Sequence, residues 1–337
     1  MLNSSTSADT AGGPTWGPDW DNYYTEELGI RTTDQVLGWV FILGTVVGLL
    51  GNGSAVCYFW PKRNQSVHNM LYLAIITVDF LTVASSFPVI ASLLNDRYPM
   101  IFNKDVFCSA WTLVSSFTAK MSIFLAAMIC VTRTIAMRCP YLTLKRTSVI
   151  SAIAGYAILL IALDLTYISF KWEHGQYVNS TCLCSAKFYE TAPIVVKYIA
   201  TVSLILQLTM PSFITFFCFV ASTWFLMTRA TLLNVDERKF RRVSVTITIF
   251  TVIFLICNIP CFVYQMFSFL SWDFPELLNV FDHRYFNYYG PLLLQFFPIF
   301  LNSAINPSVY LLRMRGYQNW IRRCFRMCFS AKVAVDG

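Results

Sequence analysis

FNYYGPLLLQFFPIFLNSAINPSVYLL (residues 286–312) contains no charged side chain and is long enough to cross a lipid bilayer as a helix. Six further apolar runs precede it, at about 36–60, 70–94, 107–131, 149–170, 192–227 and 243–270. Only 13% of the 337 residues are charged, whereas soluble domains carry about 25%. Because the runs are continuous and do not alternate, they indicate helices and not barrel strands. The sequence therefore predicts an all-α membrane protein, a bundle of seven transmembrane helices.

Charged residues divide unequally between the two sides of this predicted bundle. If the N-terminus lies outside, seven of the 25 Lys and Arg residues fall in outer segments and seventeen in inner ones, while Lys120 lies within a run. Since positive charge concentrates on the cytoplasmic side of membrane proteins, the N-terminus is predicted to be extracellular and the protein to reside in the plasma membrane. The net charge of +7 then faces lipid and an intracellular partner, and does not indicate nucleic acid.

The run boundaries divide the chain into three regions. Residues 1–35 are polar and predict a disordered, glycosylated extracellular tail, residues 36–312 form the seven-helix domain, and residues 313–337 predict a cytoplasmic amphipathic helix with a short tail. Asn3 and Asn179 begin glycosylation sequons on the outer side.

The cysteines separate by compartment. Cys108 and two cysteines of the outer loop 171–191, Cys182 and Cys184, lie on the oxidising side, so a disulfide from Cys108 to one of these two is predicted and its partner remains open. Cys324 and Cys328 lie among basic and aromatic residues after the last run and are candidate palmitoylation sites.

Polar side chains within the runs need partners, because an ionisable group in a bilayer is costly. A carboxylate with neutral oxygen ligands suits a small hard cation, whereas a hydrogen-bonded network without an ion is the equal alternative. The group comprises Asp79 with Asn52, Ser122, Asn302, Ser303 and Asn306. Five prolines predict kinks in the helices: Pro88, Pro211, Pro260, Pro298 and Pro307.

A series of motifs runs in order along residues 36–329. They are Gly51-Asn52, Asn69 ten residues before Asp79, Cys108 25 residues before Arg133, Pro140, Pro211, the set Phe254, Cys257 and Pro260, and Asn306-Pro307-Ser308-Val309-Tyr310. Together these motifs resemble the rhodopsin-like (class A) family of G-protein-coupled receptors. The resemblance implies a signalling receptor, not an enzyme, with an extracellular ligand and a heterotrimeric G protein as partners.

The resemblance also implies roles for particular side chains. An allosteric sodium ion, and no other cofactor, would be held by Asp79, Ser122, Asn302, Ser303 and Asn306. Arg133 would contact the G protein, and activation would involve Phe254, Pro260 and Tyr310.

Several positions depart from the family pattern and make the chain a divergent member. Thr132 and Thr134 flank Arg133, where an acid and a Tyr are usual. Phe240 replaces an acid that restrains this Arg in some members, so elevated basal activity is predicted. Asn258 stands where the sixth helix usually carries a Trp.

The ligand class narrows by exclusion. Ser115 replaces the Asp of amine receptors, and Phe300 replaces the retinal-binding Lys of opsins. A neuropeptide is predicted, with a small organic or anionic metabolite as the alternative, and a transporter is disfavoured because repeated halves are missing. The loop 171–191 could form the strand hairpin that is common in peptide receptors. Lys120 would pair with an anionic ligand group, with Gln207 or within the bundle. The candidate ligand contacts are Ser115, Ser116, Lys120, Lys197, Tyr198, Tyr264, Gln265 and Gln295.

Overall fold

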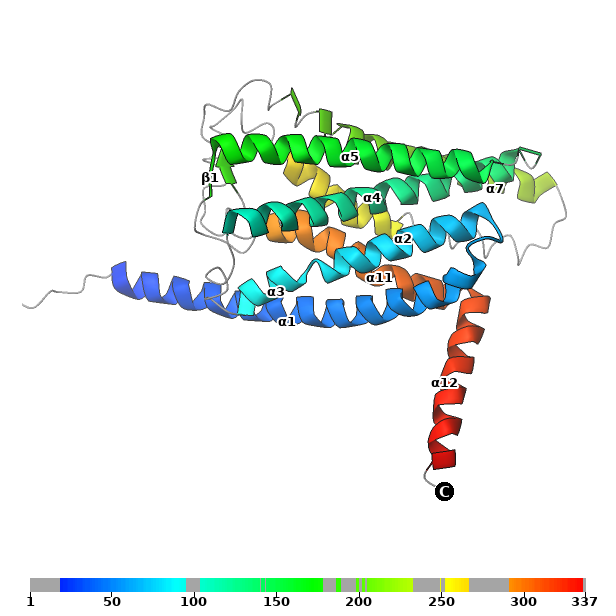
Figure 1. The fold of residues 1–337 in the computed structure, drawn as a ribbon, viewed down its shortest axis with the longest axis horizontal. Helices are drawn as coiled ribbons and strands as arrows, with labels where there is room; N and C mark the ends of the chain where they lie inside the picture. The colour runs from blue at the N-terminus through cyan, green and yellow to red at the C-terminus, as the bar shows by residue number, and fades with distance from the viewer. Residues whose placement is uncertain are drawn as a thin grey trace, which may run out of the picture.

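The computed structural model places long helices side by side along one axis, and α12 leaves one end of this bundle at a steep angle (Figure 1). It describes residues 19–94, 104–139, 141–142, 144–177, 186–188, 198–199, 202–203, 205–232, 249, 252–266 and 291–335. The longer helices are α1 (Asp19–Phe59), α2 (Val67–Ala84), α3 (Phe87–Leu94), α4 (Lys104–Arg138), α5 (Arg146–His174), α7 (Met210–Leu232), the helix Val252–Met266, α11 (Phe297–Arg313) and α12 (Arg315–Val335). Short turns are the 3-10 turn η1 (Trp60–Lys62) and the π-helical turns η3 (Ile205–Thr209) and η4 (Pro291–Phe296).

Within the described residues, five helical segments are long and apolar enough to cross a membrane. Two shorter apolar helices, Met210–Phe225 and Val252–Met266, lie within the fifth and sixth predicted runs. The bundle also turns large apolar side chains outward, such as Leu50 of α1, which is 71% exposed, and Trp224 of α7, which is 70% exposed. Such a surface is stable against lipid and would be a liability in water.

The core forms because α4 runs through the middle of the bundle. It packs against α2, α5 and α7, while α1 packs against α2, α3 and α11. The largest apolar cluster joins these helices through fully buried side chains, among them Leu71, Ile76, Leu125, Leu160 and Tyr310. Close packing of this kind holds transmembrane helices together, because lipid offers no hydrophobic driving force between them.

Two expectations about the ends of the bundle can be compared with the structure. The predicted hairpin in the loop 171–191 is present, because β1 (Gly175–Tyr177) pairs antiparallel with β2 (Ala186–Phe188). The first helix begins at Asp19, so it includes all of the described residues of the region 1–35, which was predicted to be a disordered tail.

The second predicted run is broken in two next to Pro88. A turn at Ser85 and Ser86 separates α2 from α3, because Pro88 has no N–H to continue the helical bonding. The indole of Trp111 on α4 donates to the Ser85 carbonyl at 2.8 Å. The hydroxyls of Thr45 on α1 and Ser86 lie 2.7 Å apart. The break therefore replaces helical bonds by contacts to two neighbouring helices.

α12 is attached to α1 by an aromatic and hydroxyl contact. The phenol of Tyr317 lies 2.6 Å from the Ser54 hydroxyl, and the rings of Tyr58 and Tyr317 lie 5.3 Å apart. Burial raises the pKa of the Tyr317 phenol, so the group stays neutral in this contact. Trp320 extends the ring cluster, with its centroid 5.8 Å from that of Tyr58.

Gly51 allows α1 and α11 to approach closely. A Cβ atom at this position would lie 2.6 Å from Cβ of Pro307, whose ring cannot move aside easily. Gly51→Ala is expected to lower the free energy of unfolding by about 1–3 kcal/mol through overpacking. Thermal unfolding of the purified protein in detergent measures the change.

Gly155 supplies the matched control for this prediction. It lies in α5, and a Cβ there would meet no atom within 4 Å. Gly155→Ala is therefore expected to leave the melting temperature unchanged or to raise it slightly, because Ala is the better helix former. Equal melting temperatures for Gly51→Ala and the wild-type protein would contradict the close-packing account.

Candidate functional site

The polar cluster predicted around Asp79 is assembled in the middle of the bundle. Oδ1 of Asp79 accepts hydrogen bonds from Ser122 at 2.7 Å and Ser303 at 2.9 Å. Oδ2 accepts from the Asn306 amide at 2.6 Å. All four side chains are buried, and Asn302 lies buried on the same helix as Ser303 and Asn306. Three helices, α2, α4 and α11, thus direct their polar groups at one carboxylate.

The donor set of this cluster fits a small hard cation. Each hydroxyl that now donates to Asp79 can rotate to offer a lone pair, and the Asn306 amide can offer its oxygen instead. Asn52 adds a further oxygen: its amide donates to the Ser303 carbonyl at 3.0 Å, and its buried Oδ1 accepts no hydrogen bond from any described residue. The carboxylate and the neutral oxygens around Asp79 are ligands of the kind that a small hard cation takes. No group of three His, Cys, Asp or Glu side chains gathers among the described residues.

A cavity extends from this cluster toward the end of the bundle that carries α12. It lies between α2, α4, α7, α11 and the helix Val252–Met266. Asn306 and Asn302 line its inner part, and Tyr72, Arg133 and Ser222 line the part near α12. The cavity therefore connects the Asp79 cluster with Arg133.

Arg133 has a neutral partner. Its guanidinium donates a hydrogen bond to the phenol of Tyr72 on α2 and lies 5.5 Å from the centroid of that ring. Tyr72 in turn contacts Tyr310 edge-on, with centroids 6.0 Å apart. None of the ion pairs described in the structure involves Arg133. Sequence reasoning missed Tyr72, because a Tyr in an apolar run reads as an ordinary core residue.

Thr132 and Thr134, which flank Arg133 in place of the acid and the Tyr usual in the family motif, form hydrogen bonds to groups other than its guanidinium. The Thr134 hydroxyl lies 2.9 Å from that of Ser222, which links α4 to α7. The Thr132 hydroxyl donates to the carbonyl of Ile129 in its own helix at 3.1 Å. Neither contact restrains the guanidinium directly.

The helix Val252–Met266 carries two of the predicted activation residues, Phe254 and Pro260. Phe254 is buried in a small cluster with Ile123 and Cys261. The Asn258 amide donates to the Phe254 carbonyl at 2.7 Å within the same helix. The Asn258 side chain is thus hydrogen-bonded to the backbone of its own helix, and it has no aromatic ring to replace that of the usual Trp. Pro260 lies two residues further along and is half-buried.

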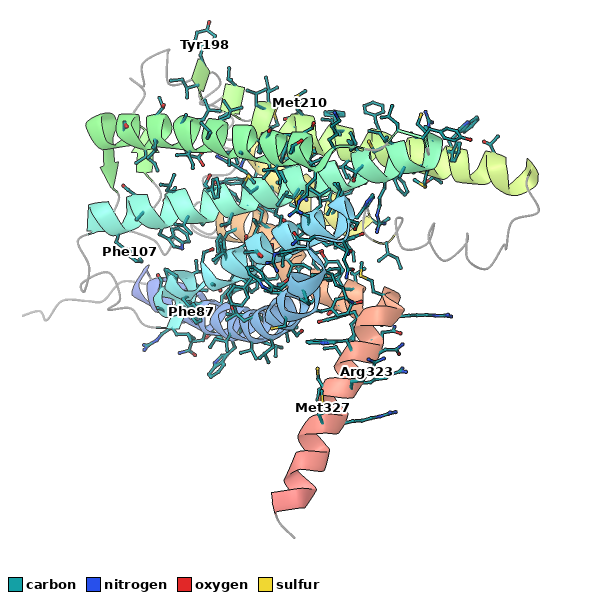
Figure 2. All side chains as sticks on the ribbon, turned by 45° about the vertical axis from the view of Figure 1, so that its right-hand side comes forward. Phe87, Phe107, Tyr198, Met210, Arg323 and Met327 are labelled. Carbon is teal, nitrogen blue, oxygen red and sulfur yellow. The ribbon has the colours of Figure 1, made fainter. Side chains whose placement is uncertain are left out.

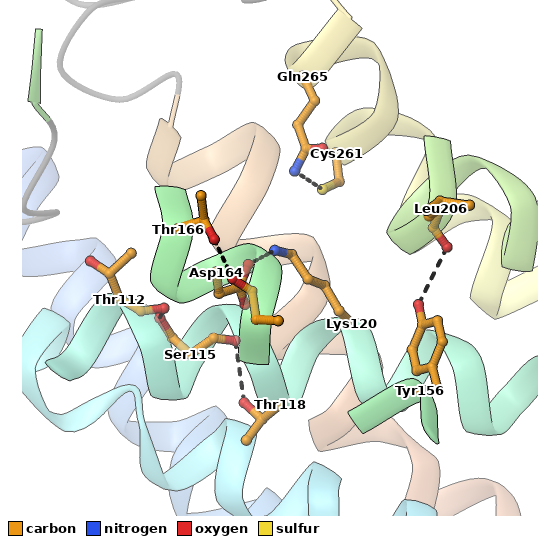
Figure 3. A network of polar contacts seen from close by, with 11 residues as sticks. Thr112, Ser115, Thr118, Lys120, Tyr156, Asp164, Thr166, Leu206, Cys261 and Gln265 are labelled. Carbon is orange, nitrogen blue, oxygen red and sulfur yellow. Dashed lines mark hydrogen bonds and ion pairs between the residues drawn. The ribbon is translucent and has the colours of Figure 1, made fainter. Parts of the chain in front are cut away.

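Lys120 forms an ion pair with Asp164 between α4 and α5 (Figure 3). Its side chain is 20% exposed and that of Asp164 7%. Sequence reasoning identified Lys120 as a charged group within the membrane but did not pair it with Asp164. The structure thus gives Lys120 a partner within the bundle, whereas the side chain of Gln207 lies outside the described residues.

The remaining ligand-contact candidates are spread over the bundle. Ser115 donates to the Trp111 carbonyl of its own helix at 2.8 Å. Gln265 contacts the Cys261 sulfur at 3.8 Å. Tyr198 is 65% exposed and projects away from the bundle (Figure 2), so the structure does not bring it to the others. Ser116, Tyr264 and Gln295 are half-buried.

Several predicted modification and contact residues cannot be compared with the structure. The residues outside the described part of the chain are Asn3, Asn179, Cys182, Cys184, Lys197 and Phe240, and the side chains of Cys108 and Cys328 are also not described. Cys324 is a half-buried free thiol on α12.

Comparison with known proteins agrees with this arrangement. The family model described as 7 transmembrane receptor (rhodopsin family) matches residues 51–310. No curated protein sequence matches the chain. Among solved structures, the crystal structure of squid rhodopsin is similar, with a TM-score of 0.63 and 19% sequence identity over 89% of this chain and 87% of that chain. At this identity the similarity establishes the fold alone.

The chain belongs to the rhodopsin family of seven-transmembrane receptors. It is therefore a multi-pass membrane protein and a signalling receptor, not an enzyme, and its family implies an extracellular ligand and a G protein as partners. The predicted fold class, a seven-helix bundle with a C-terminal helix, is confirmed.

Proposed function

We propose that this receptor lies in the plasma membrane, binds an extracellular peptide and activates a heterotrimeric G protein. The observation that carries the proposal is the cavity that joins the Asp79 cluster to Arg133 near α12. Basic side chains gather at the α12 end, including Lys62, Arg138 and Arg322, which favours this end as the cytoplasmic one. The β1–β2 hairpin then lies outside the cell.

The mechanism is a shift between two populations of the bundle. A ligand that binds the outer end more tightly in one state moves the equilibrium toward that state. Arg133, Tyr72 and Tyr310 line the opposite end of the cavity, where a change in the spacing of α4, α7 and the helix Val252–Met266 would alter access from the cytoplasm. The G protein would bind the bundle when this end of the cavity is open. Asp79, which lies between the outer end and the cytoplasmic end, would couple the two.

A peptide fits the outer end better than the other ligand classes considered. Ser115 stands where amine receptors carry an acid, and Phe300 stands where opsins carry a Lys. Phe300 is buried, and its ring centroid lies 4.8 Å from that of Phe41. The half-buried amides of Gln265 and Gln295 provide donors and acceptors of the kind that peptide groups use. The β1–β2 hairpin supplies further backbone groups at this end.

A pooled library tests the proposal. Cells that express the receptor are challenged with pooled neuropeptides and, separately, with pooled organic metabolites, and G-protein activation is recorded against cells without the receptor. Activation by a peptide pool is expected. Activation by metabolites alone would overturn the peptide assignment and keep the receptor. Silence toward every pool at normal surface density would contradict the proposed coupling.

Tyr72 is expected to set the basal activity of the receptor. It replaces the missing acids as the partner of Arg133, and a hydrogen bond to a charged group contributes about 1.5–3 kcal/mol. Tyr72→Phe removes the bond and keeps the ring, so basal G-protein activation is expected to rise about tenfold at equal surface density. Tyr58→Phe is the control, because that phenol lies by α12 and away from Arg133. Equal basal activity of Tyr72→Phe and the wild-type receptor would remove this role.

A further inference from the structure

The ion pair of Lys120 and Asp164 leaves hydrogen-bonding capacity unused. Oδ1 of Asp164 accepts from Lys120, but Oδ2 is buried and has no hydrogen-bond partner among the described residues. An ammonium group has three donors. Within the part of the chain that the structure describes, the Lys120 ammonium has one hydrogen-bond acceptor, Asp164. A buried acceptor without a partner costs about 1–3 kcal/mol of free energy. A bound group that donates a hydrogen bond to Oδ2 would remove this cost.

The neighbours of this ion pair are the helix Val252–Met266 and a pair of stacked aromatic rings. The ammonium end of Lys120 lies between Asp164 on α5 and the helix that carries Cys261 and Gln265 (Figure 3). One turn further along α4, Phe124 stacks on Tyr156 of α5 with ring centroids 3.8 Å apart. The charged pair thus lies beside an aromatic surface.

We propose that the Lys120–Asp164 pair is a subsite for a primary carboxamide of the ligand, which accepts from the Lys120 ammonium and donates to Asp164 Oδ2. The inference rests on the proposed peptide-receptor function and names the group that the receptor recognises. A primary carboxamide occurs in peptides as a terminal amide or as an Asn or Gln side chain.

Charge decides between this group and an ion. The pair is neutral overall, and in a low-dielectric bundle an added net charge is expensive. A ligand carboxylate could pair with Lys120 but would face Asp164, and a ligand ammonium could pair with Asp164 but would face Lys120. A neutral group with one acceptor and one donor satisfies both partners. This argues against the anionic ligand group that the sequence suggested for Lys120.

Amide geometry decides between a primary carboxamide and the peptide backbone. In a trans peptide the N–H and C=O point in opposite directions, so one unit cannot reach two adjacent partners. A primary carboxamide has an N–H on the same side as its oxygen. It can therefore bridge the ammonium of Lys120 and the neighbouring Oδ2 of Asp164.

Four probes that share a benzene ring test the proposal on the purified receptor: benzamide, N-methylbenzamide, benzoate and benzylamine. Benzamide is expected to raise the melting temperature by about 2 °C at saturating concentration. N-methylbenzamide lacks the N–H beside the oxygen and is expected to have no effect, like the two ions. A larger shift with benzoate or benzylamine, or no shift with any probe, would overturn the proposal.

The matched variant is the double substitution Lys120→Met with Asp164→Leu, which removes the polar groups and leaves no unpaired charge. Its melting temperature is expected to be insensitive to benzamide, and a persistent shift would show that the probe binds elsewhere and overturn the assignment. The assay contains no G protein, so its result does not depend on whether the receptor couples to one. Among activating peptides, exchange of a terminal amide for an acid, or of Gln for Glu, identifies the source of the carboxamide.

Discussion

Lys120→Met alone is expected to destabilise the receptor by about 3–5 kcal/mol. The substitution leaves the Asp164 carboxylate, which is 7% exposed, without its partner inside the bundle. Removing one member of a buried pair costs more than the pair itself contributes, because the remaining charge has lost both its partner and its water. Thermal unfolding in detergent and the yield of folded protein at the cell surface measure the loss.

The double variant with Asp164→Leu is expected to recover most of that stability. Replacement of a whole buried ion pair by apolar residues of similar volume is often neutral or stabilising. The two substitutions should therefore be strongly non-additive, as contacting residues are. A double variant as unstable as the sum of the single variants would contradict the pairing of Lys120 with Asp164.

Asp79→Asn is expected to abolish the response of the receptor to sodium. Sodium chloride should raise the melting temperature of the wild-type receptor relative to choline chloride, because an ion that binds only the folded state stabilises it. At ten times its dissociation constant the ion contributes about 1.4 kcal/mol. The substitution removes the one carboxylate of the cluster and keeps its size, so the two salts should give equal melting temperatures.

Thr82→Ala is the control for the sodium measurement. Thr82 is buried one turn from Asp79, and its hydroxyl donates to the Val78 carbonyl of its own helix at 3.0 Å. This variant should retain the full difference between sodium and choline. If the wild-type receptor itself fails to distinguish the salts, the cluster is a hydrogen-bonded network that joins the helices without an ion.

The Asp79 cluster could be predicted from sequence because its polar residues occur at similar depths in several of the apolar runs that were predicted to cross the membrane. Asn302 and Asn306 are four residues apart and therefore share a helix face. No sequence rule gives the rotation of one helix against another, so the bonds to Ser122 and Ser303 required the structure.

The Lys120–Asp164 pair could have been predicted from the same kind of argument. Lys120 lies eighteen residues before the end of α4 at Arg138, and Asp164 lies eighteen residues after the start of α5 at Arg146. Both helix ends lie at the α12 end of the bundle (Figure 1). Equal depth and opposite charge indicate a pair, since an intramembrane charge needs a partner.

Other features had no usable signal in the sequence. Tyr72 contacts Arg133 from a helix whose neighbouring positions are apolar, so its polar role depends on packing. Tyr198 was assigned to the ligand from its position near the outer end, but its side chain is 65% exposed and projects away from the bundle. The break at Ser85 follows from Pro88, whereas the Trp111 contact that satisfies it follows from the fold.

Guanine-nucleotide exchange on purified heterotrimeric G proteins tests the central claim most directly. The wild-type receptor is compared with Arg133→Ala and with Arg138→Ala, whose exposed side chain lies on the same helix. With the activating peptide present, the wild-type receptor and Arg138→Ala should accelerate exchange, and Arg133→Ala should lose about tenfold or more of that acceleration while still binding the peptide. Full acceleration by Arg133→Ala, or none by the wild-type receptor with any G-protein class, would contradict the account.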